Sequence, residues 1–252
     1  MLQVHQLTKY YHSAGTSFAA VKDVSFTIAA GEIVGLLGRS GSGKSTLARL
    51  ITGLTEYDSG CILLDNKNIN FADKQCRTNY YRQVQYIFQN PASSFHPFYT
   101  IGQSIMEPML HSGYTNSQAK KKLYALLAQT GLPIEYADRY IYQLSGGEAQ
   151  RAAIARAISI QPRLLICDEI TSALDTLTQQ KIINLLLALQ KEYKTSLLFI
   201  THDIALAADF CQRLLIMDKG SIVEAGTAQT IIKTPQHPAT QQLLRAAHNL
   251  NI

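Results

Sequence analysis

Hydrophobic residues along this chain follow two periods, which predict strands in some segments and helices in others. Before residue 65 the apolar runs are short, and one of them, 24–28, alternates with polar residues as a half-buried strand does. The elements predicted here are short strands within 2–35, a buried strand at 33–37, a helix from Ser45 to Leu54 ended by Gly53, and a strand at 61–64.

Between residues 90 and 145 the pattern changes to helices interrupted by turns. In the segment 118–130, Leu123, Leu126 and Leu127 fall on one helical face. The residues that punctuate this region are Pro91, Pro97, Pro108, Gly113 and Pro133. We therefore predict an inserted helical subdomain at about 90–160.

Strands and helices alternate again in the last third of the chain. The predicted elements are a buried strand at 164–167, a helix at 176–191, a strand at 196–200, and a hairpin of 214–217 and 222–224 around the turn 218–220. This order implies an α/β fold with a mainly parallel sheet. We predict one domain, 1–252, with a core of about 1–89 and 161–225 and a short C-terminal tail, 226–252.

Composition supports one well-buried domain and argues against several other classes of protein. Hydrophobic residues make up 46% of the 252 residues, and the net charge of +5 is mild. No dense Lys/Arg run indicates nucleic acid as a partner. The four cysteines form no C-x-x-C pair, so neither a zinc site nor a redox motif is expected. No signal segment is seen, and no apolar run approaches the roughly 20 residues that span a bilayer.

A glycine-rich loop between the buried strand at 33–37 and the following helix carries the first chemical signal. It fits the P-loop pattern G-x-x-x-x-G-K-[ST] with Gly38-Arg39-Ser40-Gly41-Ser42-Gly43-Lys44-Ser45-Thr46. Backbone N–H groups at the helix N-terminus would face phosphates, Lys44 would supply a cation, and Ser45 a ligand for Mg²⁺. A chance Gly/Ser loop is the alternative, and the flanking strand and helix disfavour it.

An acidic pair ends the strand at 164–167. Asp168 and Glu169 follow four apolar residues, which matches the Walker B pattern. Asp168 would hold Mg²⁺, and Glu169 would act as general base toward the attacking water. Taken alone, such a pair would more simply cap the next helix.

The octet Leu144-Ser145-Gly146-Gly147-Glu148-Ala149-Gln150-Arg151 resembles the signature motif of ABC-type ATPases. Ser145, Gly146 and Gly147 open a predicted helix, 148–159, whose N-terminus can bind a γ-phosphate. Lys44 and Ser145 fall in different predicted subdomains, so two chains packed head to tail would form two shared ATP sites. Glu148 stands where the family usually has Gln, which places a carboxylate near the partner's nucleotide.

Further residues match ABC ATPase positions. Gln89, after a predicted strand at 84–88, resembles the glutamine that reaches Mg²⁺ and water, and His202 resembles the switch histidine at the γ-phosphate. Tyr11 fits the aromatic residue that stacks on adenine, with Tyr10 as a rival. A solvated glutamine, a surface histidine and a core tyrosine are the structural alternatives. The resemblance also places the D-loop at Ser172-Ala173-Leu174-Asp175, and Ile170 stands where Pro is common.

The C-terminal tail narrows the resemblance to one branch of the family. The segment Thr234 to Leu244, with His237-Pro238 at its centre, is similar to the C-terminal region of peptide and nickel importer ATPases. Phe210-Cys211-Gln212-Arg213 and Ile216-Met217-Asp218 are similar to nickel-importer members. Members often continue further, and because this chain stops at residue 252 we expect no accessory regulatory domain.

The resemblance implies an α/β fold with a P-loop NTPase (RecA-like) core, an N-terminal antiparallel β subdomain and the inserted helical subdomain. It also implies an ATPase and translocase subunit of an ABC importer that uses ATP and Mg²⁺. The expected partners are a second ATPase subunit, identical or a paralogue, two membrane permeases and, indirectly, a substrate-binding protein. The expected place is the cytoplasmic face of the cell membrane, and the cargo stays open between nickel, a metal–chelator complex and short peptides. A soluble ABC ATPase acting on nucleic acid or ribosomes, or another P-loop NTPase, is the alternative.

Overall fold

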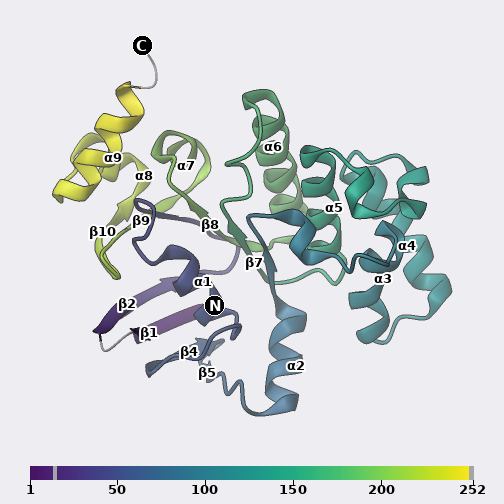
Figure 1. The fold of residues 1–252 in the computed structure, drawn as a ribbon, viewed down its shortest axis with the longest axis horizontal. Helices are drawn as coiled ribbons and strands as arrows, with labels where there is room; N and C mark the ends of the chain where they lie inside the picture. Colours follow the sequence, from purple (N-terminus) through teal and green to yellow (C-terminus); the bar gives the residue numbers. More distant parts are fainter. Residues whose placement is uncertain (14–15, 250–252) are drawn as a thin grey trace. The chain divides into compact units, whose positions relative to one another are not determined.

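A computed structural model describes residues 1–13 and 16–249, which form two compact units (Figure 1). Unit 1 comprises Met1–Tyr81 and Ser196–Ile252, and unit 2 comprises Arg82–Thr195. Helix α2 (Lys74–Gln83) runs across this boundary. The last three residues of the predicted tail lie outside the described part of the chain.

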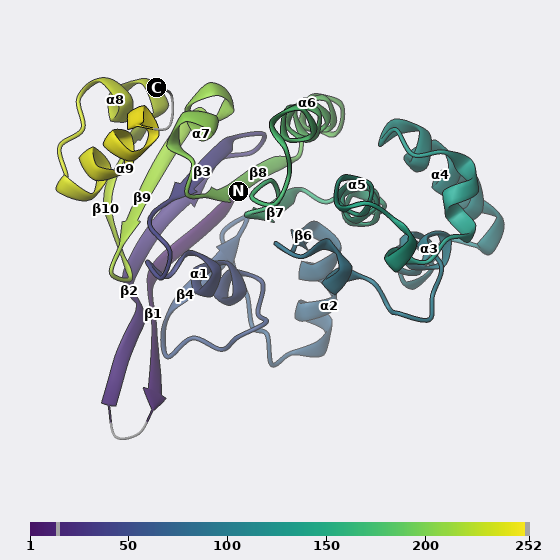
Figure 2. The same ribbon diagram turned by 45° about the horizontal axis from the view of Figure 1, so that its top comes forward.

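Unit 1 contains an antiparallel sheet with the strand order β2-β1-β4-β5. The alternation at 24–28 has its expected result, because Val24, Phe26 and Ile28 are buried while Ser25 and Thr27 are exposed. The strands are β1 (Leu2–Ser13), β2 (Thr16–Ile28), β4 (Ser59–Leu64) and β5 (Lys67–Asn68). The short strands predicted within 2–35 are instead one long hairpin of β1 and β2 (Figure 2), in which residues 10–12 and 16–18 are exposed.

A second set of strands in unit 1 surrounds β3 (Ile33–Leu37), all of whose residues are buried. β3 pairs in parallel with β8 (Ser196–Thr201) and β9 (Arg213–Asp218), and β9 pairs antiparallel with β10 (Ser221–Thr227). The helices of unit 1 are α1 (Lys44–Ile51), α7 (Ile204–Phe210), α8 (Ala228–Lys233) and α9 (Pro238–Asn249). The predicted parallel strands and C-terminal hairpin are both present.

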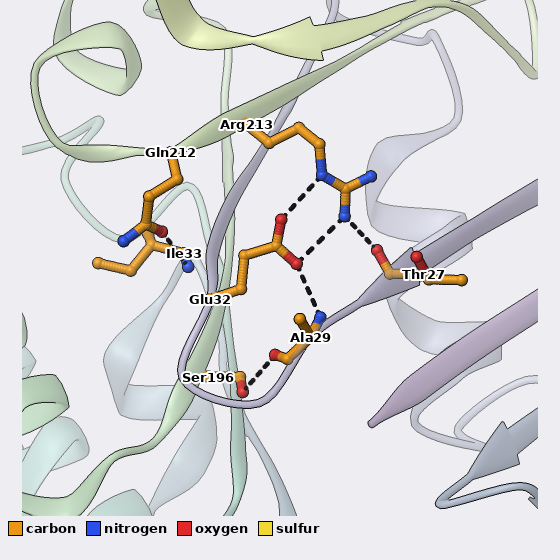
Figure 3. A network of polar contacts seen from close by, with 7 residues as sticks. All are labelled: Thr27, Ala29, Glu32, Ile33, Ser196, Gln212 and Arg213. Atoms are coloured by element: carbon orange, nitrogen blue, oxygen red, sulfur yellow. Dashed lines mark hydrogen bonds and ion pairs between the residues drawn. The ribbon is translucent and has the colours of Figure 1, made fainter.

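A polar network fixes the turn between β2 and β3 (Figure 3). The Glu32 carboxylate accepts hydrogen bonds from the Ala29 amide at 2.7 Å and from Arg213 Nε at 2.8 Å. Arg213 also donates to the Thr27 carbonyl, and Ser196 Oγ donates to the Ala29 carbonyl at 3.0 Å. Burial raises the pKa of Glu32, but the hydrogen bonds from Arg213 and Ala29 outweigh it and hold that pKa below its usual range. The network ties the end of β2 to β8 and β9, and so sets where β3 starts.

Unit 2 combines a parallel strand pair with a helical region. β6 (Val84–Ile87) pairs with β7 (Leu164–Asp168). The helices are α3 (Ile101–His111), α4 (Asn116–Gln129), α5 (Gly146–Ile158), α6 (Thr176–Tyr193), and the 3-10 turns η1 (Pro91–Ser94), η2 (Ile134–Asp138) and η3 (Ile141–Gln143). Leu123, Leu126 and Leu127 are buried on one face of α4, as the sequence predicts.

Among residues 1–13 and 16–249, no helix combines the length and the apolar character needed to cross a membrane.

Candidate functional site

The glycine-rich loop of unit 1 links the end of β3 to α1. The side chain of Lys44, the first residue of α1, is only 4% exposed, and its Nζ donates to the carbonyls of Gly38 at 2.8 Å and Arg39 at 3.0 Å. At the rim, Arg39, Ser40 and Gly41 are exposed. Gly43 precedes the helix with φ of 107° and has no side chain with which to cap the N–H groups of α1. A helix N-terminus without a side-chain cap, beside a buried ammonium group, is suited to an anion.

The β1–β2 hairpin packs directly on this loop. A methyl group at Gly43 would lie 2.3 Å from the carbonyl oxygen of Ala20 on β2. The neighbouring Ala19 pairs with Tyr10 of β1, so Tyr10 and Tyr11 lie on the part of the hairpin next to the loop. The two rings are 41% and 42% exposed, and successive strand residues point to opposite faces. Only one of them can therefore face a ligand in the loop.

His202 is placed beside the loop by strand register. Leu37, the last residue of β3, pairs with Thr201, the last residue of β8. Gly38 and His202 each follow these partners by one residue, and His202 is exposed. The Asp203 carboxylate accepts from the Leu206 amide at 3.0 Å and caps α7. The histidine thus occupies the exposed turn between β8 and α7, at the edge of the sheet where the loop begins.

Gln89, Asp168 and Glu169 come together in unit 2. Ile87 of β6 pairs with Cys167 of β7, so the residues after these two strands run alongside one another. Gln89 Nε2 donates to Glu169 Oε2 at 3.3 Å. Asp168 is buried, and its Oδ2 accepts a hydrogen bond from the Tyr86 hydroxyl at 2.6 Å. Sequence reasoning missed Tyr86, since a tyrosine inside a strand carries no signal of its polar partner.

The chain turns sharply at Glu169. Its φ of 47° lies in the left-handed region, which a non-glycine residue rarely adopts. The turn is held by Ser172, whose amide and hydroxyl both donate to the Glu169 carbonyl, at 3.2 Å and 2.9 Å. Ile170, in the place where Pro is common, is buried. Asp175 then caps α6, and its pKa is lowered by hydrogen bonds from Thr178.

The octet Leu144 to Arg151 forms the capped N-terminus of α5. Ser145 is the N-cap residue, and Glu148 completes a capping box with it. Glu148 also accepts a hydrogen bond from the Tyr136 hydroxyl at 2.7 Å, a partner that sequence reasoning missed. The bonds from Tyr136 and from the amide and hydroxyl of Ser145 lower the pKa of Glu148 to about 2. A methyl group at Gly147 would lie 2.7 Å from Thr178 Cγ2, so this motif packs on the start of α6.

The arrangement groups the predicted site residues by unit. Unit 1 holds the phosphate-loop residues, Tyr11 and His202. Unit 2 holds Gln89, the acidic pair, and the glycine motif beside the segment Ser172–Asp175. The glycine-rich loop is suited to bind phosphate, and the Gln89–Glu169 pair is suited to activate a water molecule.

Known proteins are similar to this chain in sequence and in fold. Residues 21–172 match the family described as "ABC transporter". The dipeptide transport ATP-binding protein DppD of Escherichia coli (strain K12) is 40% identical over 98% of this chain and 78% of its own length. The glutathione import ATP-binding protein GsiA of Pectobacterium atrosepticum is 42% identical over 90% of this chain and 37% of its own length. The dimeric post-hydrolysis structure of the ATP-binding cassette MJ0796, bound to ADP and Pi, superposes with a TM-score of 0.83 at 29% identity, covering 90% of this chain and 99% of that one.

Proposed function

The chain belongs to the ABC transporter family, and we propose that it is the ATP-hydrolysing subunit of an importer of short peptides. The relatives above are named for dipeptide and glutathione transport, and another, from Brucella ovis, is named as a putative peptide import protein at 37% identity over 98% of this chain. These names favour peptides over nickel or a metal–chelator complex, the other cargoes left open by the sequence.

We propose that ATP binds through its phosphates to the loop from Gly38 to Thr46. The single observation that carries this is the buried Lys44, held by two loop carbonyls beside an α1 N-terminus that has no side-chain cap. Its ammonium group and the backbone N–H groups would offset phosphate charge. Tyr11, on the hairpin next to this loop, is the proposed adenine contact, with Tyr10 as the alternative.

We also propose roles in hydrolysis for individual residues. Ser45, Asp168 and Gln89 are the proposed ligands of Mg²⁺, directly or through water; the ion would neutralise phosphate charge. Glu169 is the proposed general base, with Gln89 as the group that orients the same water, and the 3.3 Å contact between their side chains supports this pairing. His202 is proposed to sense the γ-phosphate, since strand register sets it next to Gly38.

The proposed assembly is a head-to-tail dimer, with an identical chain or a paralogue as partner. Ser145, Gly146, Gly147 and Glu148 would then face the ATP bound to the partner subunit. We further propose that the dimer docks on two membrane permeases at the cytoplasmic face of the membrane. An extracytoplasmic binding protein would deliver the peptide to them. Residues 91–111 are the proposed link to the permeases.

Replacing Glu169 with Gln tests the hydrolytic assignment. We expect ATP turnover to fall by at least about 100-fold, the usual contribution of a general base, while ATP still binds. The matched control is Glu135→Gln, an exposed glutamate of η2, which should leave turnover unchanged. A Glu169→Gln protein that hydrolyses ATP at the wild-type rate would rule out Glu169 as the general base.

The cargo needs a separate experiment. Cells that lack the gene for this chain should lose uptake of a radiolabelled dipeptide and recover it on complementation. Retained dipeptide uptake together with loss of 63Ni²⁺ uptake would overturn the proposal of a peptide cargo. Co-purification with integral membrane subunits would separate the importer from a soluble ABC ATPase.

A further inference from the structure

The Glu148 carboxylate holds the hydroxyl group of Ser145. Ser145 Oγ donates to Glu148 Oε2 at 2.7 Å, and the Ser145 amide donates to the same oxygen at 2.8 Å. The other carboxylate oxygen, Oε1, accepts from the Tyr136 hydroxyl at 2.7 Å. Both oxygens are therefore anchored by protein donors, and the carboxylate is fixed in place beside Ser145.

Capping of a helix does not require this negative charge. In the same unit, α3 and α4 begin with capping boxes that use Gln in the corresponding position. Gln103 Oε1 accepts from the Thr100 amide at 2.8 Å, and Gln118 Oε1 accepts from the Thr115 amide at 2.9 Å. A neutral amide thus binds the N-cap amide as closely as Glu148 does.

The negative charge of Glu148 strengthens the hydrogen bond that it accepts from the Ser145 hydroxyl. Thr115 Oγ1 donates to Gln118 Oε1 at 3.1 Å, whereas Ser145 Oγ donates to Glu148 at 2.7 Å. Hydrogen bonds to an ionised acceptor are shorter and about twice as strong as neutral ones. A serine hydroxyl has one proton. While Glu148 accepts that proton, Ser145 cannot donate it to another group.

We propose that Glu148 is a positioning residue that restrains ATP-driven dimer closure by holding the Ser145 hydroxyl. The inference rests on the proposed function, in which Ser145 faces the γ-phosphate of the partner's ATP. Phosphate oxygens are acceptors, so Ser145 can bond to them only by releasing Glu148. Tyr136 keeps the carboxylate in the orientation that makes this competition effective. The result is a subunit that needs more ATP to close than one with Gln in this position.

Glu148→Gln tests this with an ATP titration of the ATPase rate, made on the complex isolated through a tag on this chain. Gln keeps one oxygen, which can complete the capping box as it does in α3 and α4. Its NH2 group replaces the oxygen that faces Tyr136, and it can donate to the tyrosine hydroxyl oxygen. We expect the ATP concentration for half-maximal rate to fall by roughly fivefold, equivalent to one ordinary net hydrogen bond. The half-maximal ATP concentration should change more than the maximal rate does, because the substitution acts on binding and closure. The matched control is Gln118→Glu, which makes the reverse exchange in the α4 capping box and should move neither value.

A double-mutant cycle distinguishes an effect that acts through the Ser145 hydroxyl from simple repulsion between the Glu148 carboxylate and the phosphates. In a Ser145→Ala background, Glu148→Gln should no longer shift the half-maximal ATP concentration. A shift of the same size there, or no shift in the wild-type background, would overturn the proposal. Thermal melting of each variant checks that the fold is kept. Failure of the proposed function itself would appear differently, as absent ATP hydrolysis by the wild type or as full activity of Glu169→Gln.

Discussion

The close approach of Gly43 to Ala20 predicts that any side chain at Gly43, in the glycine-rich loop, lowers the stability of the protein. In a Gly43→Ala protein, φ of 107° would strain an L-residue by about 1–3 kcal/mol. The new Cβ would also lie 2.3 Å from the Ala20 carbonyl oxygen, and such overpacking costs a further 1–3 kcal/mol or so. We therefore expect the free energy of unfolding to fall by about 4 kcal/mol, which is a large part of the total stability of a domain.

Gly41→Ala is the matched control for this prediction. Gly41 also has a positive φ, of 78°, but a methyl group there would meet no atom within 4 Å. It should cost only about 1–2 kcal/mol, the penalty of the left-handed backbone. Urea unfolding of both proteins without nucleotide, followed by circular dichroism, measures the difference. Equal losses in the two variants would refute the reasoning, because the hairpin would then impose no constraint on the loop.

Three further predictions concern other parts of the chain. Tyr80→Phe should lower stability by about 2 kcal/mol in thermal melting, because the Tyr80 side chain is 1% exposed and its hydroxyl donates to the Ile51 carbonyl at 2.7 Å; an unchanged melting temperature would contradict this. Tyr136→Phe should raise the pKa of Glu148 from about 2, as NMR titration would detect. That folded pKa lies below the unfolded value of about 4.3. The stability contributed by Glu148 is therefore complete above pH 4.3 or so and is lost as the pH falls toward about 2. The difference in the free energy of unfolding between wild type and Tyr136→Phe should accordingly shrink over that range. Glu224→Gln should speed proteolysis between α8 and α9, because the Glu224 carboxylate accepts from the amides of Gln236 and His237 at 2.9 Å and 3.0 Å; equal cleavage rates would show that this anchor is not needed.

Much of the fold follows from apolar runs and glycine signals. The buried strands β3, β7 and β8 were predicted within a residue or two, and α5 starts at the glycine motif as expected. The predicted family and the α/β P-loop fold are confirmed by the relatives and the superposed structures. Helix α2 was missed, because only Tyr80 on it is buried and its sequence has no apolar period.

The candidate site was predicted by motif, but its contacts were not. The motif predicts that Ser145, Gly146 and Gly147 open α5, but it predicts neither the capping box of Glu148 nor its bond to Tyr136, which a separate 3-10 turn brings to the carboxylate. The left-handed turn at Glu169 is likewise invisible, because no glycine marks it. The ligand roles of the site residues stay predictions until the variants above are measured.

The pairing of β3 has a consequence for synthesis of the chain. Its partners β8 and β9 follow it by about 160 residues or more, so this sheet has a high contact order and cannot close while the first half is being made. At about 5–20 residues per second, the ribosome needs roughly 8–30 s to supply β8. During that interval the fully apolar β3 has neither of its final neighbours. A nascent chain stalled before residue 196 should therefore bind chaperones strongly, whereas a chain stalled after β9 has emerged should bind them much less.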